Sequence, residues 1–94
     1  MALGDITRDT GSPRQVGNVF LLEGTLEATT TTTAFALVSE RSRLISVVAV
    51  AQDGASAAIA VLNQNAAGTT VNGTAAITGT NASVETFRYQ AFYV

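Results

Sequence analysis

The pair Asp53-Gly54 is the sequence feature that most constrains the fold of this chain. It separates two apolar runs, 44–52 and 55–67. An Asp-Gly pair in that setting favours a two-residue β-hairpin turn with both residues at positive φ. The register that follows places Val50 opposite Ala57, with large side chains facing small ones. The chain is therefore predicted to turn back on itself near its middle.

A helix is the alternative for the run 55–67. The run is rich in alanine, and Ala58, Ile59 and Leu62 fall at helical spacing. Ile59 and Val61 fit a period of two equally well, and the hairpin accounts for the position of the glycine. We favour the strand for these reasons, and a loop at 63–68 ends it.

Alternating apolar and polar residues predict further strands on both sides of this turn. Residues 18–28 alternate as a half-buried strand does. A run of five threonines, 29–33, follows as a strand edge or a connection, with a polar contact ladder against a partner as the alternative. In 34–40, Phe35 and Leu37 are predicted to face inward. The remaining predicted strands are 44–52, the run after the turn, 69–79 (with a hairpin at Asn72-Gly73 or a short strand ending at Gly79) and 82–94. This pattern indicates an all-β fold, a small antiparallel β-sandwich or barrel, immunoglobulin-like or jelly-roll-like.

The first residues do not have the pattern of any regular element. Residues 1–15 carry mixed charge and a Gly-Ser-Pro break, with Ile6 as the one large apolar residue after Leu3. We predict an extended N-terminal arm over 1–15 and a single sandwich domain over 16–94. Such an arm can add strands to a neighbour's sheet edge, and charge pairs of Arg8, Asp9 and Arg14 would set its register.

The composition excludes most chemistry. The 94 residues include no cysteine, no histidine and no lysine, which leaves no disulfide, no thiolate or imidazole metal ligand and no common general base. No phosphate-binding glycine motif is present. We therefore expect no enzymatic activity, no metal and no cofactor, and expect association with other chains to stabilise so small a domain.

The low charge of the chain also indicates association with other chains. Only 13% of residues are charged and the net charge is −2, which argues against a nucleic-acid partner. No run is long and apolar enough for a membrane span, and the opening residues lack a secretory leader. A surface with so little charge is expected to be covered in the working state.

Four further residues are candidates for partner contacts. Arg41 and Arg43 lie on a short polar turn, and arginine suits interfaces. Tyr89 and Tyr93 belong to the aromatic last strand, and tyrosine favours sites with one apolar and one polar side.

The arm, the cysteine-free Thr/Ala/Gly-rich core and the C-terminal "TFRYQAFYV" together resemble the small decoration (cement) proteins of tailed-bacteriophage capsids. The resemblance implies a structural virion protein, made in the host cytoplasm, that binds the outside of the shell and stabilises contacts between major capsid protein subunits. It implies the major capsid protein and copies of the chain itself, as a homotrimer, as partners. A tail, neck or fibre-associated β protein is the alternative, and a carbohydrate-binding β-sandwich a more distant one.

Overall fold

The computed structural model describes residues 2–38, 42–52 and 56–94, and every regular element in these ranges is a β-strand. No helix long and apolar enough to cross a membrane occurs in this part of the chain. The strands are β1 (Ile6–Arg8), β2 (Arg14–Val16), β3 (Val19–Ala28), β4 (Thr33–Ala36), β5 (Leu44–Ala51), β6 (Ala58–Gln64), β7 (Thr70–Gly79) and β8 (Glu85–Tyr93).

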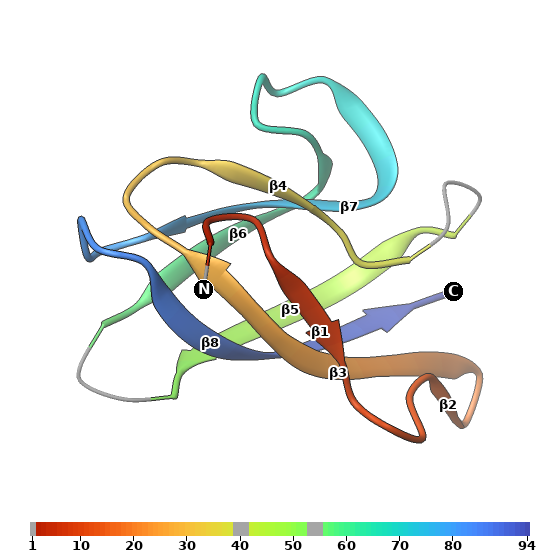
Figure 1. Cartoon of the computed structure of the whole chain (residues 1–94). Coiled ribbons are helices and arrows are strands. Elements are labelled where there is room, and N and C mark those ends of the chain that lie inside the picture. Colours follow the sequence, from red (N-terminus) through yellow and green to blue (C-terminus); the bar gives the residue numbers. More distant parts are fainter. Residues whose placement is uncertain (1, 39–41, 53–55) are drawn as a thin grey trace.

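The six strands from β3 to β8 form one long hairpin that is rolled up (Figure 1). Its two halves pair in nested order: β3 with β8, and β4 with β7, both antiparallel. Near the tip, Val50 forms an antiparallel bridge with Ala57. That bridge has the register predicted from the sequence, but the pairing of β5 with β6 expected to continue from it is wrong, because β5 and β6 belong to different sheets. The turn residues Asp53 and Gly54 lie outside the described residues.

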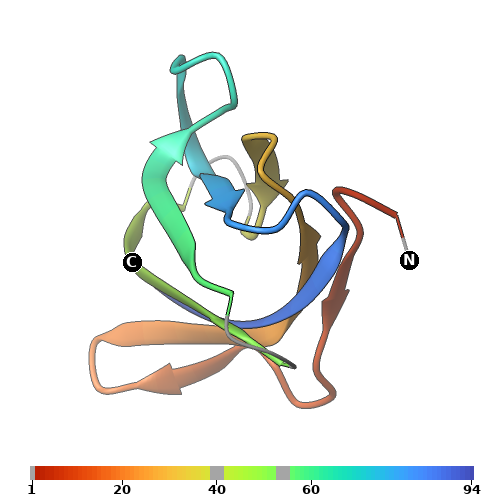
Figure 2. The ribbon, with the colours of Figure 1, turned by 90° about the vertical axis from the view of Figure 1, so that its left-hand side faces the viewer.

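Rolling this hairpin produces two sheets that face each other (Figure 2). One has the order β1-β3-β8-β5, with β2 also paired to β3, and the other has the order β4-β7-β6. The chain crosses from one sheet to the other between β3 and β4, β4 and β5, β5 and β6, and β7 and β8. This nested order is that of a jelly roll, here with six strands instead of eight, so it favours the jelly-roll-like alternative over the immunoglobulin-like one.

The core is the space between the sheets, filled from inward-facing positions of both. Leu22 and Leu26 of β3 and Phe87 and Tyr89 of β8 are at most 1% exposed. From the facing sheet, β4 contributes Phe35, which is also 1% exposed. The other core residues are Ala28, Leu37, Leu44, Ala75, Ile77 and Ala91. The inward orientation predicted for Phe35 and Leu37 is thus confirmed.

In the second half of the chain, the structure confirms the strand predicted after the turn and contradicts the hairpin at Asn72-Gly73. Residues 58–64 form a strand, as preferred over the helix, because the inward Ala58, Ala60 and Leu62 pack against the core at a period of two. The hairpin considered at Asn72-Gly73 is wrong, since both residues lie inside β7. Gly73 adopts a φ of 83° within the strand, so the glycine marks a bend in β7 instead of its end.

Residues 29–32 of the threonine run connect β3 to β4, and Thr33 is the first residue of β4. Within it the backbone N–H of Thr31 donates to the Thr29 hydroxyl at 3.0 Å, and the Thr33 hydroxyl donates to the carbonyl of Thr31 at 3.0 Å. The hydroxyls therefore take up polar backbone groups that a connection between sheets leaves without ladder partners.

The extended arm predicted over residues 1–15 is not confirmed. Strands β1 and β2 pair antiparallel with successive parts of β3 in the same chain, and Figure 1 shows both alongside it. The physical reason is that β3 would otherwise present a row of unpaired N–H and C=O groups at the edge of its sheet. The segment covers this edge, although its own pattern is too irregular to predict a strand.

The segment nevertheless adds little to the core. All residues of β1 and β2 are exposed, and among the described residues no member of the core cluster precedes Leu22. Backbone hydrogen bonds and surface side chains hold it in place.

Candidate functional site

Three charged side chains of the N-terminal segment contact the domain, those of Arg8, Asp9 and Arg14. The Arg8 guanidinium donates to the Leu37 carbonyl at 3.2 Å, which links β1 to the chain just beyond β4 in the facing sheet. Asp9 forms an ion pair with Arg88 of β8. Further along, Nη2 of Arg14 lies 2.6 Å from Oε1 of Glu23. Asp9 and Arg14 thus form ion pairs within the chain, whereas Arg8 bonds a backbone carbonyl. The charge pairs predicted for these three residues on a foreign sheet stay a prediction.

These contacts create a charged surface on the outside of sheet β1-β3-β8-β5. Glu23 also accepts a hydrogen bond from Gln90 at 3.2 Å, and its backbone N–H donates to the Ser12 hydroxyl at 2.8 Å. The hydrogen bond with Asp9 raises the pKa of Arg88 above its ordinary value. Because these side chains are largely exposed, salt screens their attraction and each pair adds little stability.

Gly24 of β3 is the residue that allows β1 to lie where it does. A Cβ at this position would stand 2.0 Å from the carbonyl oxygen of Thr7, far inside van der Waals contact. We expect Gly24→Ala to displace β1 from β3 and to leave the core intact. Hydrogen exchange should show loss of protection of the amides that bond β1 to β3, with β8 amides unchanged. Thr25→Ala is the matched control, because it changes the neighbouring residue of β3 without adding an atom, and it should leave β1 in place.

The two candidate tyrosines have different environments. Tyr89 is 1% exposed, and burial raises the pKa of its hydroxyl above the ordinary 10.0. This contradicts the prediction of a partner contact for Tyr89, because both sheets cover its ring. Tyr93 is half-buried and stacks on Phe20, with ring centroids 5.6 Å apart. Of the two, only Tyr93 lies near the surface.

The remaining candidates are separated from one another. Ile6 is 40% exposed on β1, at one edge of its sheet. Arg43 precedes β5, at the opposite edge. Arg41 lies outside the described residues. Ile6, Arg8, Asp9 and Arg14 thus lie along the same edge of β3, and Arg43 lies apart from them.

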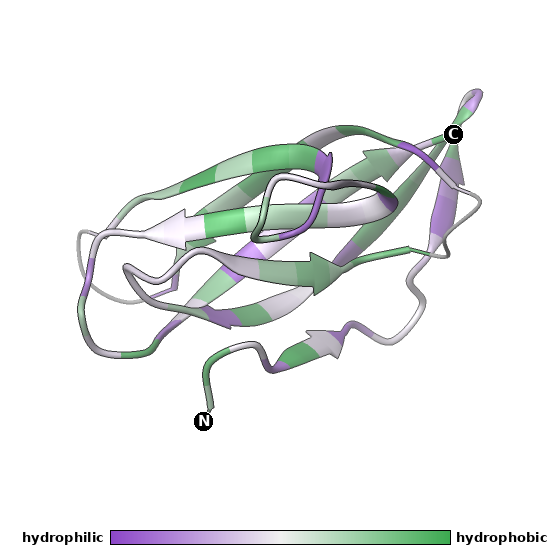
Figure 3. Ribbon diagram, turned by 90° about the horizontal axis from the view of Figure 1, so that it is seen from above, coloured by the Kyte–Doolittle hydropathy of each residue, from purple (hydrophilic) through white to green (hydrophobic). Residues whose placement is uncertain are grey.

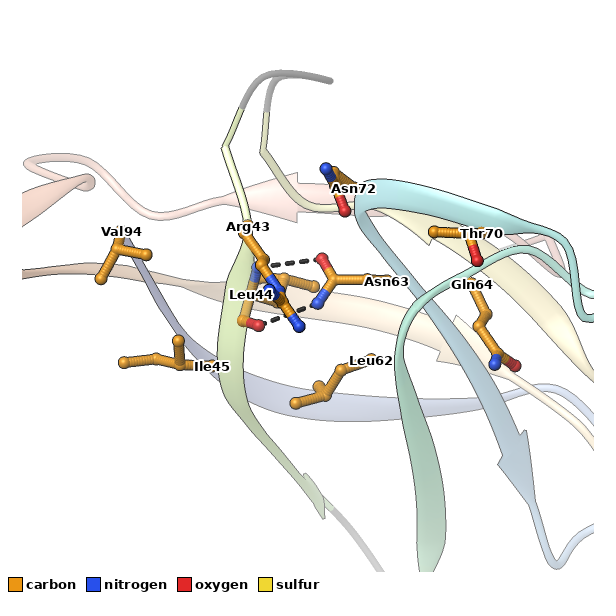
Figure 4. Close-up of a pocket in the computed structure, with 9 residues that line it drawn as sticks. All are labelled: Arg43, Leu44, Ile45, Leu62, Asn63, Gln64, Thr70, Asn72 and Val94. Carbon is orange, nitrogen blue, oxygen red and sulfur yellow. Dashed lines mark hydrogen bonds between the residues drawn. The ribbon is translucent and has the colours of Figure 1, made fainter.

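Arg43 lines a hollow of about 730 Å³ where β5 and β6 diverge (Figure 4). Near Val50 and Ala57 the two strands are bridged. Beyond that point β6 pairs with β7 instead, which leaves the hollow between β5 and β6. The hollow has an aliphatic side and an amide-rich side. Its lining residues are Arg43, Leu44, Ile45, Leu62, Asn63, Gln64, Thr70, Asn72 and Val94.

Asn63 closes the inner end of this hollow. Its side-chain oxygen accepts from the backbone N–H of Leu44 at 3.0 Å and from that of Gly73 at 3.1 Å. Its amide nitrogen donates to the Leu44 carbonyl at 2.9 Å, and Figure 4 shows both bonds to Leu44. The side chain thus bonds Leu44 as a neighbouring strand would. Asn63 has a φ of 57°, which asparagine tolerates better than most residues.

Sequence reasoning missed the role of Asn63, which it placed in a loop. A signal was available, since asparagine at the end of an apolar strand pattern is a known left-handed position. The backbone groups that its side chain reaches could not be identified without the fold.

Sequence reasoning also missed a ridge of exposed aliphatic side chains along β5 and β6. Ile59 is 71% exposed and Val50 is 59% exposed, both pointing away from the core. We call the set the β5–β6 ridge: Ile45, Val48, Val50, Ile59 and Val61, each at least 44% exposed. The signal was visible, because 44–52 is apolar on both faces and only one face of a strand at the end of a sheet can point into the core.

Among the residues described, no three histidine, cysteine, aspartate or glutamate side chains gather as a metal site would require. Hydrogen bonds from Ser56 and Asn81 lower the pKa of the Glu85 carboxyl from its ordinary 4.5. The most conspicuous features of the surface are therefore the paired N-terminal segment, the hollow at Arg43 and the β5–β6 ridge.

Comparison of the chain with protein-family models, with curated proteins and with solved structures found no match.

Proposed function

We propose that this chain is a structural virion protein that binds the outside of a tailed-phage capsid as a homotrimer. In that role it stabilises contacts between major capsid protein subunits and has no catalytic step of its own. The resemblance in the N-terminal segment, the core composition and the C-terminal strand is the starting point.

The observation that carries the proposal is the way in which residues 2–16 are attached. They lie along the edge of β3 through exposed strands, and among the described residues none of them contributes to the core. A segment held in this way can leave the edge at small cost to the domain. It can then pair with an exposed strand of a shell protein by the same backbone hydrogen bonds.

The side chains of the segment are suited to such an exchange. Asp9 and Arg14 are each in an exposed ion pair with the domain, and exposed pairs are weak. A guanidinium on the shell could replace Arg88 as the partner of Asp9, and a carboxylate could replace Glu23 as the partner of Arg14. Docking of the domain beside the segment would offset the entropy lost when the segment is ordered.

Deletion of residues 2–15 tests this proposal. We expect the shortened chain to remain folded by circular dichroism, because its core is complete, and to attach to shells that lack it at least about tenfold more weakly, a loss of about 1.4 kcal/mol. Co-sedimentation with purified shells measures the attachment.

Gly24→Ala is the matched control for the deletion. It keeps every residue of the segment but displaces β1 from its own β3 edge. If the segment pairs with the shell, this variant attaches as well as the unmodified chain. Equal losses for the deletion and for Gly24→Ala would mean that the segment serves its own sheet alone, and the proposal would then be wrong.

A further inference from the structure

One side of the sandwich lies between β3 and β4, which belong to different sheets. The other side is bridged directly, by Val50 of β5 and Ala57 beside β6. Residues 4–8 run along the first side, and we call them the strap. Figure 3, which looks down on sheet β4-β7-β6, shows the strand of the strap, β1, at the lower edge of the picture, beside β3 and β4. The strap therefore borders both sheets, although it is paired with β3.

The strap leans over the edge of β3 toward the facing sheet. Gly24 shares the inward face of β3 with Leu22 and Leu26, because side chains alternate along a strand. The side chain that Gly24 lacks would thus point between the sheets. The strap takes that place, since a Cβ on Gly24 would stand 2.0 Å from the carbonyl oxygen of Thr7 and 3.1 Å from the Cα of Arg8. The backbone of β1 therefore lies partly over the gap between the two sheets.

Both ends of the strap reach β4 in the facing sheet. At the first end, a Cβ on Gly4 would lie 3.7 Å from Cγ2 of Thr33, the first residue of β4. At the second end, Nη2 of Arg8 donates to the carbonyl oxygen of Leu37 at 3.2 Å, one residue beyond the end of β4. The strap thus extends along the whole of β4. Its first end makes a van der Waals approach, and its second end a charge-assisted hydrogen bond, which is the stronger contact.

Arg8 also lies in one row with Gly24 and Tyr89. The ladder places Arg8 opposite Gly24, and Gly24 opposite Tyr89, and directly opposed residues point to the same face of a sheet. Burial raises the pKa of Tyr89, whereas the charge of Arg8 and a side-chain hydrogen bond from it oppose this rise. Arg8 therefore contacts polar groups on both sides of the gap, the Tyr89 hydroxyl and the Leu37 carbonyl. A buried hydroxyl that loses its partner is costly, so these contacts favour the closed position of the strap.

We propose that the strap closes this side of the sandwich and that Arg8 is its latch. When the strap leaves, the bond to Leu37 and the contact with the Tyr89 hydroxyl are lost together. The rest of the strap is held by exposed strand hydrogen bonds, which open locally at low cost. Arg8 therefore sets the fraction of time that the segment spends away from β3. The latch itself is independent of the proposed function, and only its use, release of the segment to a shell protein, rests on that proposal.

Amide hydrogen exchange of the full chain, followed by NMR, measures the opening of the strap. Two N–H groups that join the segment to β3 report it: that of Asp9 donates to the Glu23 carbonyl at 3.0 Å, and that of Glu27 donates to the Asp5 carbonyl at 2.9 Å. In Arg8→Ala we expect both amides to exchange at least about tenfold faster, because a hydrogen bond from a charged group is lost. Arg8 is exposed, so the variant should still fold.

Two further variants make the test specific. Arg14→Ala is the matched control, because it removes a guanidinium of the same segment from an exposed ion pair, which adds little stability, and both amides should exchange as in the unmodified chain. Arg8→Lys keeps a charged donor, and its exchange rates should fall between those of Arg8→Ala and the unmodified chain. Unchanged exchange in Arg8→Ala would overturn the inference. Equal acceleration in Arg14→Ala would also overturn it, because loss of any charge would then release the segment.

Attachment to purified shells, measured on the same Arg8→Ala chain, separates this inference from the proposed function. Faster attachment together with faster exchange supports both, since release of the segment would then precede its pairing with the shell. Faster exchange without faster attachment would contradict that use of the segment and leave the latch standing.

Discussion

Phe87→Ala should lower the free energy of unfolding by about 3–5 kcal/mol, the usual range for truncating a buried phenylalanine. Phe87 is 1% exposed and stands between Leu26 of β3 and Ala51 of β5 in the ladder. Its ring also approaches Gly79 of the facing sheet. Its removal would open a cavity that spans both sheets.

The size of this loss matters because the domain is small. A chain of this length has a total stability of about 5–14 kcal/mol, so the variant would lose a large fraction of it. Urea unfolding followed by circular dichroism measures the change. The slope of the unfolding free energy against urea concentration should be the same for the variant and the unmodified chain if both unfold in two states.

Phe20→Ala is the matched control, a phenylalanine on the neighbouring strand that is 40% exposed and stacks on Tyr93. A stacked surface pair adds about 1 kcal/mol beyond its buried area, so this variant should cost much less. Equal losses for the two variants would show that Phe87 does not occupy the core described here.

Asn63→Ala should cost roughly 2.5–6.5 kcal/mol, an effect comparable to that of Phe87→Ala. The variant loses three hydrogen bonds, each with a net value of about 0.5–1.5 kcal/mol, from the Leu44 N–H, the Leu44 carbonyl and the Gly73 N–H. Alanine at a φ of 57° adds roughly 1–2 kcal/mol of backbone strain. Thermal unfolding measures the sum.

Two companion variants divide the effect of Asn63 into its parts. Asn63→Gly removes the hydrogen bonds but suits the positive φ, so it should be the milder change. Asn63→Asp keeps an oxygen that accepts from the N–H groups of Leu44 and Gly73. It replaces the amide nitrogen that donates to the Leu44 carbonyl at 2.9 Å with a second carboxylate oxygen, which cannot donate. If all three variants were as stable as the unmodified chain, the side chain would not hold β5 and β6 together.

The residues predicted from the sequence as partner contacts lie in different environments in the structure, for a physical reason. Arginines and aspartates in a short chain pair with one another, and Asp9 pairs with Arg88 of the same molecule, while the pair expected with a partner chain stays a prediction. Which carboxylate meets which guanidinium depends on strand register. Tyr89 shows the same limit, since alternation put it on the same face as Phe87 but could not indicate that the facing sheet would cover its ring.

Local residue patterns predicted strands β3 to β8 and the turn between β5 and β6. Alternation in 18–28 and 82–94 and the pair Asp53-Gly54 are local signals, because side-chain direction repeats every two residues and turn chemistry acts over a few bonds. The bridge between Val50 and Ala57 follows from them.

The arrangement of the two sheets sets which strands the N-terminal segment and β5 to β8 pair with, and which surfaces stay exposed. Residues 4–16 lie on the edge of β3 because Gly24 leaves room for the carbonyl of Thr7, and Asn63 bonds Leu44 because rolling the hairpin separates β5 from β6 at that end. These contacts join residues far apart in the chain, so their energies depend on the arrangement of whole sheets. No local pattern of residues carries that information.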